Sequence, residues 1–381
     1  MTDDESYRSA PPPLTSITTS TRHTAPITHQ RQHVPEIKFS DLPSQQETSA
    51  TSTPPIIPTP ILDTPLGEMP PDATNVTTNT KLAATDSKYQ NYHLMVDRTQ
   101  DDKAVEIALF TAKRPHMRAF HYAWVSFFVA FFTWFAIAPL LSEVAVTLKL
   151  SKENIWTSNI MAVAGTAVVR ATIGPFCDKY GARVCTVVTL VASAIPALAL
   201  CFVQDSVGLS LCRLVVGVGG GTFVTGQYWT SSMFTREVVG TANALVAGWG
   251  NLGGGVTQVV MGSVLFPLFK LFFKTDVTTG RTPEELAWRT VLIVPALMSF
   301  ITAYFIFCHS DDSPKGNYEK RTREGLRNEV STLQAMKTSL ADFNTWLLFI
   351  QYACCFGVEI TMSNAAALYF KHEFDLTTET A

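Results

Sequence analysis

Apolar and charged residues divide the sequence into two parts that differ sharply. After about residue 115, long apolar runs alternate with short charged connections. An apolar run of about 20 residues can cross a ~30 Å hydrocarbon core as a helix. The pattern therefore predicts seven membrane-spanning helices, over residues 119–142, 154–177, 184–203, 209–230, 239–265, 290–308 and 344–370.

The first part of the chain, residues 1–115, is rich in Ser, Thr and Pro. Such a composition buries too little apolar surface to offset the entropy of ordering. We expect a disordered tail, with a short amphipathic helix over 101–110 as its one regular element. A passive extension is favoured over a segment regulated by phosphorylation.

The connections between the apolar runs indicate the topology. The longest is 310–343, which is charged and separates the sixth run from the seventh. Lys and Arg gather in the connections on the side of the tail, which places the N-terminus in the cytoplasm. The expected organisation is a tail (1–115), a six-helix bundle (116–309), a cytoplasmic linker (310–343) and a seventh helix with the end of the chain (344–381).

Composition excludes several classes of function. The net charge is −3 and no basic helix appears, so a nucleic-acid partner is not expected. The seven cysteines lack metal-ligand spacing with histidine. No nucleophile–base pair or phosphate-binding loop stands outside the spans. We therefore expect no enzyme activity, no metal and no cofactor, and the sequence names no partner protein.

A glycine-rich stretch, 248–258, lies inside the fifth run. On a helix, Asn251, Gly254, Gly255 and Gln258 fall on one face, at i, i+3, i+4 and i+7. Glycine costs a helix about 1 kcal/mol relative to alanine, so this concentration requires a reason. Close helix packing is one reason, and the placing of Asn251 at a buried polar site is the other. The packing positions of the stretch are Gly248, Gly250, Gly253, Gly254, Gly255 and Gln258.

Two ionisable residues stand within predicted spans. A guanidinium in a span costs at least ~2.5–3.5 kcal/mol, so Arg170 should face a cavity or a partner. Its planar, permanently charged group suits a planar oxyanion, whereas the alternative is an arginine that snorkels to the interface. Glu359 fits either a proton-coupling carboxylate or a structural hydrogen-bonding group.

Three motifs carry a resemblance to known transporters. The segment 174–183, Gly-Pro-Phe-Cys-Asp-Lys-Tyr-Gly-Ala-Arg, resembles the loop motif of the major facilitator superfamily between spans two and three. The segment 213–219, Arg-Leu-Val-Val-Gly-Val-Gly, resembles the span-four motif of that superfamily, and 248–258 resembles the signature of its nitrate/nitrite porters. The resemblance implies an all-α membrane protein with the major facilitator fold. The residues that it implies for gating are Gly174, Asp178, Gly181, Arg183 and Arg213.

The resemblance also implies a substrate site. In the nitrate porters, an arginine at the place of Arg170 binds the anion. Phe223 resembles the aromatic residue on span four that covers the anion, and Tyr352 and Phe356 resemble two residues on span seven. Asn251 is the polar residue of the signature. The surroundings of Glu359 are most similar to the eukaryotic high-affinity branch, which implies proton-coupled import of nitrate or nitrite across the plasma membrane.

The sequence also departs from this family. A second arginine on span eight and a second glycine-rich signature on span eleven are expected, and neither occurs in these 381 residues. We therefore expect an incomplete chain. The alternatives are a non-transporting remnant, a truncated regulatory membrane protein, or a facilitator for another small solute.

Overall fold

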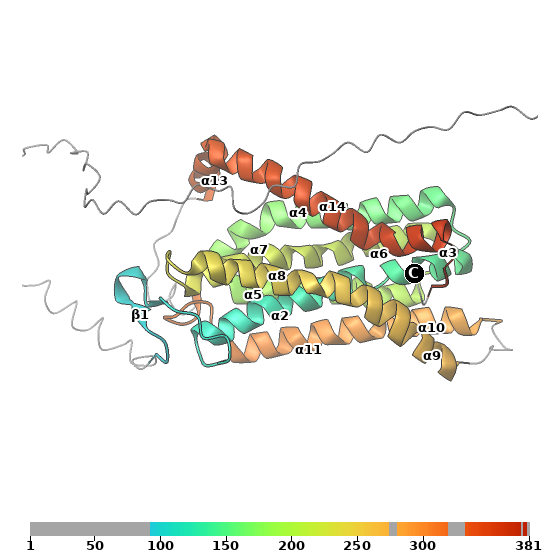
Figure 1. The fold of residues 1–381 in the computed structure, drawn as a ribbon, viewed down its shortest axis with the longest axis horizontal. Coiled ribbons are helices and arrows are strands. Elements are labelled where there is room, and N and C mark those ends of the chain that lie inside the picture. Colours follow the sequence, from blue (N-terminus) through green and yellow to red (C-terminus); the bar gives the residue numbers. More distant parts are fainter. Residues whose placement is uncertain (1–91, 274–279, 319–331, 375, 379–381) are drawn as a thin grey trace, which may run out of the picture. The chain divides into compact units, whose positions relative to one another are not determined.

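The structure, a computed structural model, describes residues 92–273, 280–318, 332–374 and 376–378 (Figure 1). Within these residues, seven helical segments are long and apolar enough to cross a membrane, as the apolar pattern predicts. They are His116–Thr147, Lys152–Tyr180, Ala182–Phe202, Ser206–Met233, Val239–Phe272, Pro283–His309 and Phe343–Lys371. Each contains nearly all of the corresponding predicted span, and the all-α membrane fold class is confirmed.

Several spans consist of more than one helical element. The α-helices are α2 (His116–Phe135), α3 (Leu141–Thr147), α4 (Lys152–Tyr180), α5 (Ala182–Ala199), α6 (Ser206–Val216), α7 (Thr222–Met233), α8 (Val239–Thr257), α9 (Phe266–Phe272), α10 (Pro283–Val291), α11 (Ile293–His309), α13 (Thr332–Ala341) and α14 (Phe343–Glu373). Short 3₁₀ turns are η3 (Arg98–Gln100), η4 (Ala138–Leu140), η5 (Leu200–Phe202) and η6 (Gly217–Gly221), and η7 (Gln258–Leu265) is a π-helix.

Polar residues set where several helices begin. The Ser151 side chain accepts a hydrogen bond from the backbone N–H of Asn154 and caps α4, and Asp205 caps α6 in the same way. These caps satisfy backbone donors that a helix start leaves without intrahelical partners. Helix α4 ends at Gly181, whose φ of 88° favours glycine.

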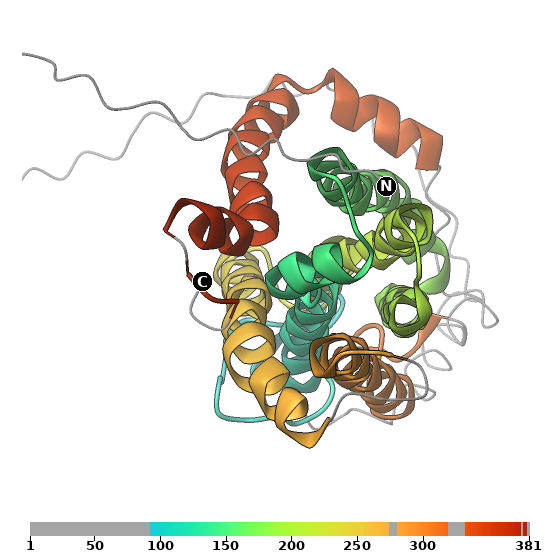
Figure 2. The same ribbon diagram turned by 90° about the vertical axis from the view of Figure 1, so that its right-hand side faces the viewer.

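The core of the bundle is built around α2. This helix packs against α5, α7, α8 and α11, and Figure 2, which views the helices from one end, shows it among them. Its aromatic residues fill the interior: Phe120, Phe127, Phe131 and Trp134 are each at most 2% exposed. Because other helices surround α2, residues on every face of this helix are buried. This explains why the first span is apolar on every side.

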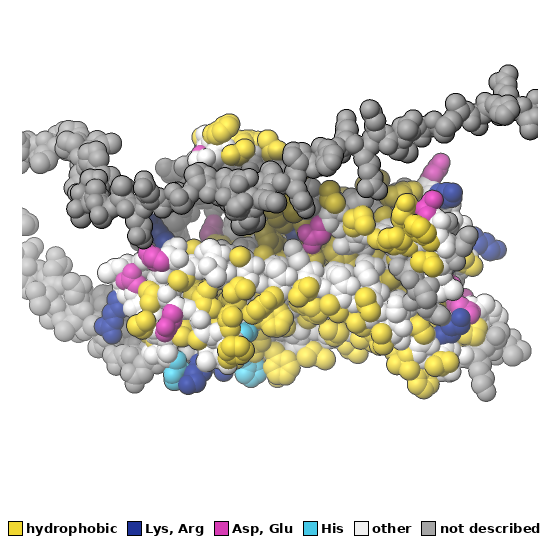
Figure 3. Space-filling view, viewed as in Figure 1, with side chains coloured by type: hydrophobic (Ala, Val, Ile, Leu, Met, Phe, Trp, Pro, Cys, Tyr) yellow, Lys and Arg dark blue, Asp and Glu magenta, His cyan; other side chains and the backbone are white. Residues whose placement is uncertain are grey.

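Charged side chains gather at the two ends of the helices. Figure 3 shows hydrophobic side chains over much of the face between these ends, as expected for a surface that meets lipid. We call the end with His116, Met233 and His309 the near end. The end with Thr147, Lys152 and Phe272 is the far end.

The structure of residues 92–115 differs from the prediction made for them. They were expected to be disordered with a helix over 101–110, but they form a two-stranded antiparallel hairpin, β1 (Val96–Asp97) and β2 (Lys103–Ala104). Ala104 is fully buried and bonds the backbone of 234–235, and Lys103 Nζ donates to the Ser231 carbonyl oxygen at 2.9 Å. Tertiary contacts with the bundle order this segment despite its polar composition. Residues 1–91 of the expected tail lie outside the described residues.

Helix α14 attaches to the bundle mainly toward the far end. There Lys371 Nζ contacts Glu143 Oε1 of α3 at 3.0 Å, and Gln258 Nε2 donates to the Ser363 carbonyl oxygen at 2.8 Å. Before Tyr352, the described part of α14 makes no hydrogen bond to the bundle. Figure 1 shows α14 (red) close to α3 and α6 and further from the bundle toward α13.

Candidate functional site

Arg170 is fixed by two hydrogen bonds from different parts of the fold. Its Nε donates to the Gly220 carbonyl oxygen of η6 at 2.9 Å, and its Nη1 donates to the Tyr352 hydroxyl of α14 at 3.0 Å. The remaining nitrogen, Nη2, is buried and has no hydrogen-bond partner among the described residues. The arginine therefore faces the interior between α4, η6 and α14 and does not snorkel to an interface.

Aromatic rings surround this guanidinium. Arg170 Cζ lies 5.0 Å from the centroid of the Phe223 ring and 4.1 Å from that of Phe356. The Tyr352 ring stacks on both, with interplanar angles of 19° to Phe223 and 15° to Phe356. The fold thus brings together four of the predicted substrate residues from three separate elements. Tyr352 is 42% exposed, so this cluster is open on one side.

Glu359 lies on the same helix as Tyr352 and Phe356, half-buried. It interacts electrostatically with Arg170 but forms no salt bridge with any described residue. Seven residues separate Glu359 from Tyr352, so the two lie on one face of α14. Both readings of Glu359, as a proton-coupling carboxylate and as a structural group, stay open.

The glycine-rich stretch packs α8 tightly against α2. A Cβ at Gly250 would overlap the Phe127 ring, and one at Gly253 would overlap the Phe128 carbonyl. Gly254 is also buried, and a Cβ there would lie 3.3 Å from the Phe135 ring. In contrast, Gly248 and Gly255 are exposed, with open space where a Cβ would lie. Close helix packing thus accounts for three of these glycines and leaves the other two unexplained.

Asn251 and Gln258 have different surroundings. The Asn251 Oδ1 atom is buried and without a hydrogen-bond partner among the described residues. Gln258 instead holds α14 through the Ser363 carbonyl. No contact joins Asn251 to Arg170 within the described residues. The structure therefore leaves an unpaired amide oxygen on α8, and its role in anion binding stays a prediction.

The predicted gating residues fall into two places. At the near end, Asp312 accepts a hydrogen bond from the Arg183 backbone N–H at 2.9 Å, and Arg183 Nη1 donates to the Phe307 carbonyl oxygen at 2.8 Å. Gly181 must lack a side chain because a Cβ there would press on the Asp312 carboxylate. Burial raises the pKa of the Asp312 carboxyl above its ordinary value, and the Arg183 charge opposes this rise.

Asp178 and Gly174 lie beside this junction and line a shallow cavity with Tyr228 and α13. Arg213 lies elsewhere. It is 2% exposed inside the bundle, where Nη1 donates to Ser158 Oγ at 2.9 Å and Nη2 to Asn364 Oδ1 at 2.8 Å. The motif resemblance places Arg213 in one group with the gating residues of segment 174–183. In the fold, Arg213 lies apart from them.

Sequence reasoning missed several residues of these clusters. Asp311 forms a salt bridge with Arg114 at 2.7 Å, and the adjacent Asp312 holds Arg183. Two consecutive carboxylates directly after the sixth span were a signal for such a junction. Asn364, in the seventh span, was a second signal because polar side chains in spans seek partners.

The arrangement at Arg170 suits a small anion. A guanidinium with one free nitrogen offers directed donors, and the Tyr352 hydroxyl adjoins it. The ring faces exclude water on their side of the group, which strengthens electrostatic attraction. The described residues contain no cluster of three or more metal-ligating side chains.

Comparison with known proteins identifies the family of the chain. A family model described as "Major Facilitator Superfamily" matches residues 123–381, most of the chain. The chain belongs to the major facilitator superfamily. It is therefore a multi-pass membrane protein of a transporter family.

Curated proteins similar to this chain include nitrate transporters. High affinity nitrate transporter 2.5 of Arabidopsis thaliana is 34% identical over 281 residues, which cover 74% of this chain and 54% of that protein. High-affinity nitrate transporter 2.3 of Oryza sativa subsp. japonica is 35% identical over 281 residues, 74% of this chain and 53% of that protein. The nitrate/nitrite transporter NrtP of Nostoc punctiforme is 28% identical over 57% of this chain and 42% of that protein.

Solved structures support the fold alone. A bacterial homologue of the human lysosomal transporter Spinster, in an inward-facing and unoccupied conformation, aligns with a TM-score of 0.52 at 14% identity. The alignment covers 70% of this chain and 58% of that one. The chain spans about half the length of the two curated relatives from Arabidopsis thaliana and Oryza sativa subsp. japonica.

Proposed function

We propose that this chain is part of a transporter for nitrate or nitrite, and that Arg170 binds the anion. The supporting observation is the Arg170 guanidinium, which is held by Gly220 and Tyr352 among aromatic rings and keeps one buried nitrogen free. The similarity to high-affinity nitrate transporters supplies the identity of the anion. Asn251, with its unpaired amide oxygen, contributes to the same transport path.

The direction and the coupling follow from electrostatics. We place the near end in the cytoplasm, because Lys and Arg gather in the connections at that end. The membrane that we propose is the plasma membrane. Moving one negative charge into a cell costs ~2.3 kcal/mol per 100 mV of inside-negative potential. Uptake therefore needs more protons than nitrate ions, and Glu359, beside Arg170, is the carboxylate placed to carry one.

Proteoliposomes containing the full chain test this proposal. With an inside-negative potential and an inward proton gradient, ¹⁵N-nitrate should accumulate, and Arg170→Gln should abolish the accumulation. Dissipation of the proton gradient alone should reduce it. Nitrate binding without accumulation would support the non-transporting alternative. Accumulation of an unrelated neutral solute in place of nitrate would support a facilitator with another substrate.

A further inference from the structure

A second polar cluster lies between the same helices as Arg170, closer to the far end. Its centre is Arg213, whose side-chain partners Ser158 and Asn364 are both neutral. The Arg213 Nε atom is buried without a partner, and the residue forms no salt bridge within the described part of the chain. An uncompensated charge in a low-dielectric interior carries a large desolvation cost, so a counter-ion is expected nearby.

Asn159 supplies an independent observation. Its side chain is 6% exposed, yet neither Nδ2 nor Oδ1 has a hydrogen-bond partner among the described residues. Buried amides are almost always hydrogen-bonded, so this one lacks the partner for which it is placed. Asn159 of α4 and Asn364 of α14 line one cavity of about 380 Å³ between the two helices. Arg213 reaches the wall of this cavity through its hydrogen bond to Asn364.

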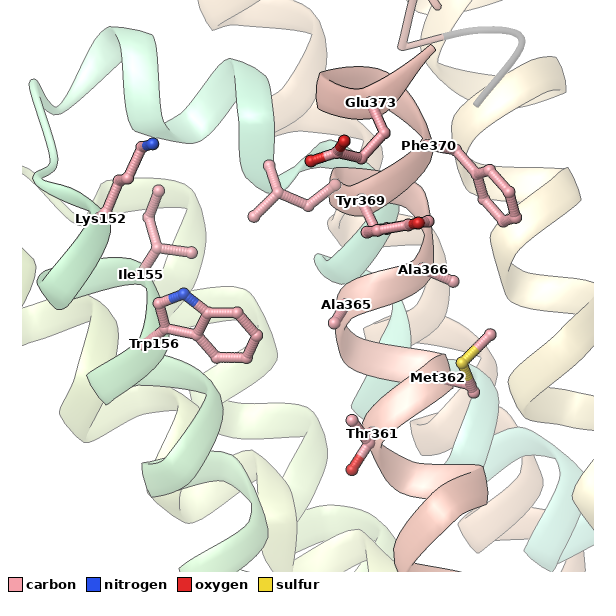
Figure 4. Close-up of a pocket in the computed structure, with 11 residues that line it drawn as sticks. Lys152, Ile155, Trp156, Thr361, Met362, Ala365, Ala366, Tyr369, Phe370 and Glu373 are labelled. Carbon is pink, nitrogen blue, oxygen red and sulfur yellow. The ribbon is translucent and has the colours of Figure 1, made fainter. Parts of the chain in front are cut away.

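The cavity continues toward the far end. A neighbouring cavity of about 480 Å³ shares Trp156 with it and extends to Lys152 and Glu373 at the rim. Figure 4 shows Lys152 and Trp156 of α4 on one side of this space and α14 on the other. At this rim Lys152 attracts anions toward the space between the helices, and the Glu373 carboxylate opposes this attraction.

The spacing along α4 links the two cavities to the Arg170 site. Lys152, Asn159 and Arg170 are separated by seven and eleven residues, which places them on one face of the helix. At 1.5 Å per residue, Asn159 lies about 10 Å from Lys152 and about 16 Å from Arg170 along the axis. The two polar clusters thus use the same elements, since α4, α14 and the span of α6 and η6 contribute to both.

We propose that Asn159, Arg213 and Asn364 form an outer site for a small monovalent anion, through which nitrate passes on its way between the far end and Arg170. The anion supplies the charge that Arg213 lacks and accepts a hydrogen bond from Asn159 Nδ2. The choice of nitrate rests on the proposed function, whereas the site itself rests on the unpaired groups of Arg213 and Asn159.

Iodide quenching of Trp156 fluorescence tests the site in the full chain, in lipid nanodiscs. Iodide is a monovalent anion that quenches an indole on contact, and Trp156 lines both cavities. At constant ionic strength, we expect a saturable component of quenching that nitrate competes away. Trp156→Phe should remove this component, which assigns the signal. Arg170→Gln should leave it in place, because the two sites are distinct.

Asn159→Asp is the decisive variant, because it keeps the shape of the side chain and places a fixed negative charge in the cavity that Asn364, the partner of Arg213, also lines. It should weaken the saturable component by roughly tenfold or more, as loss of a charge-assisted contact does. Asn154→Asp is the matched control, because it adds the same charge to the same helix outside both cavities. The affinity of this variant for iodide should stay near that of the unmodified chain. Asn159→Leu should weaken iodide binding as well, without adding charge.

Quenching that rises linearly with iodide, or that saturates equally in Asn159→Asp, would overturn the proposal. So would loss of the saturable component in Arg170→Gln, because a single site would then explain the signal. If iodide saturates through Asn159 but the proteoliposomes accumulate no nitrate, the outer site stands and the proposed transport function fails.

Discussion

Arg170 and Arg213 both lie within spans, and their surroundings differ. Arg170 donates to a carbonyl and a hydroxyl and lies against ring faces at an open side. Arg213 is fully enclosed and donates to a hydroxyl and an amide. In both cases the planar group uses several nitrogens at once, a geometry that lysine cannot reproduce.

Arg170→Lys should therefore weaken nitrate binding although the charge is kept. The three donors of lysine share one nitrogen, so they cannot reproduce the planar fork whose separate nitrogens reach Gly220, Tyr352 and the anion. Loss of one such charge-assisted bond, worth about 1.5–3 kcal/mol, corresponds to roughly 10- to 150-fold in affinity. Isothermal titration of the full chain with sodium nitrate measures this. Arg281→Lys, at an arginine in the loop before α10, is the control, and an unchanged affinity in Arg170→Lys would contradict the assignment of the site.

Asn251 gives the second prediction at this scale. The Asn251 Nδ2 group can donate to an anion, and its buried Oδ1 has no partner among the described residues. Asn251→Ala should therefore lower apparent nitrate affinity by roughly 5- to 150-fold, the equivalent of ~1–3 kcal/mol. Surface expression should change little, because alanine favours the helix. Packing alone predicts the reverse: Gly254→Leu would disrupt the fold, and Asn251→Ala would have almost no effect. Nitrate uptake and expression of both variants separate the two accounts.

At the scale of elements, α2 and α8 approach so closely that side chains are excluded from their contact. Gly250 and Gly253 meet the Phe127 ring and the Phe128 backbone. Because lipid tails are as apolar as a helix surface, close van der Waals contact provides much of the association energy between membrane helices. At Gly250 and Gly253, contact with α2 thus offsets the low helix propensity of glycine. At Gly248 no neighbouring atom occupies the place of a Cβ, so this compensation is absent.

Gly250→Ala and Gly248→Ala form a matched pair on one helix. A methyl group at Gly250 collides with Phe127, so this change should destabilise the fold by about 1–3 kcal/mol. The same change at Gly248 enters open space and should be neutral or stabilising by up to ~1 kcal/mol. Thermal unfolding in detergent compares the two variants. Equal midpoints would show that the approach of α8 to α2 is looser than described.

At the scale of the whole molecule, α14 is held to the rest of the bundle by contacts near the far end. Lys371 bonds Glu143 and Thr378, and Gln258 bonds the Ser363 backbone. These contacts hold the seventh span against the first and the fifth. The hydrogen bond between Arg170 and Tyr352 is the one nearest the start of α14 among the described hydrogen bonds that join this helix to the bundle.

The hairpin beneath the near end leads to a prediction about truncation. Removing residues 1–91 should leave thermal stability unchanged, because their composition supports no core. Extending the deletion to residue 115 should lower stability, since it removes buried Ala104 and the ion pair of Arg114 with Asp311. A midpoint shift of several degrees should accompany the loss of a few kcal/mol. Equal unfolding midpoints for the two deletions would contradict a stabilising role of the hairpin.

The amino-acid sequence determined the spans, because twenty apolar residues have no stable place outside a membrane or a large core. It also determined which residues are unusual for a membrane interior: Arg170, Glu359 and the amides at 251 and 258 stand out against their surroundings. Motif resemblance then joined Arg170, Phe223 and Tyr352 into one predicted cluster, and the structure places them in contact.

Tertiary structure alone decided the partners of these residues. Asp312 accepts a hydrogen bond from the Arg183 backbone, because the turn after α11 lies against the start of α5. The hairpin at 96–104 is ordered by the bundle, which local composition does not reveal. Arg213, Asn159 and Asn364 come from spans far apart in the sequence. Which polar groups stay unpaired depends on how three helices meet, and helix periodicity alone does not fix that arrangement.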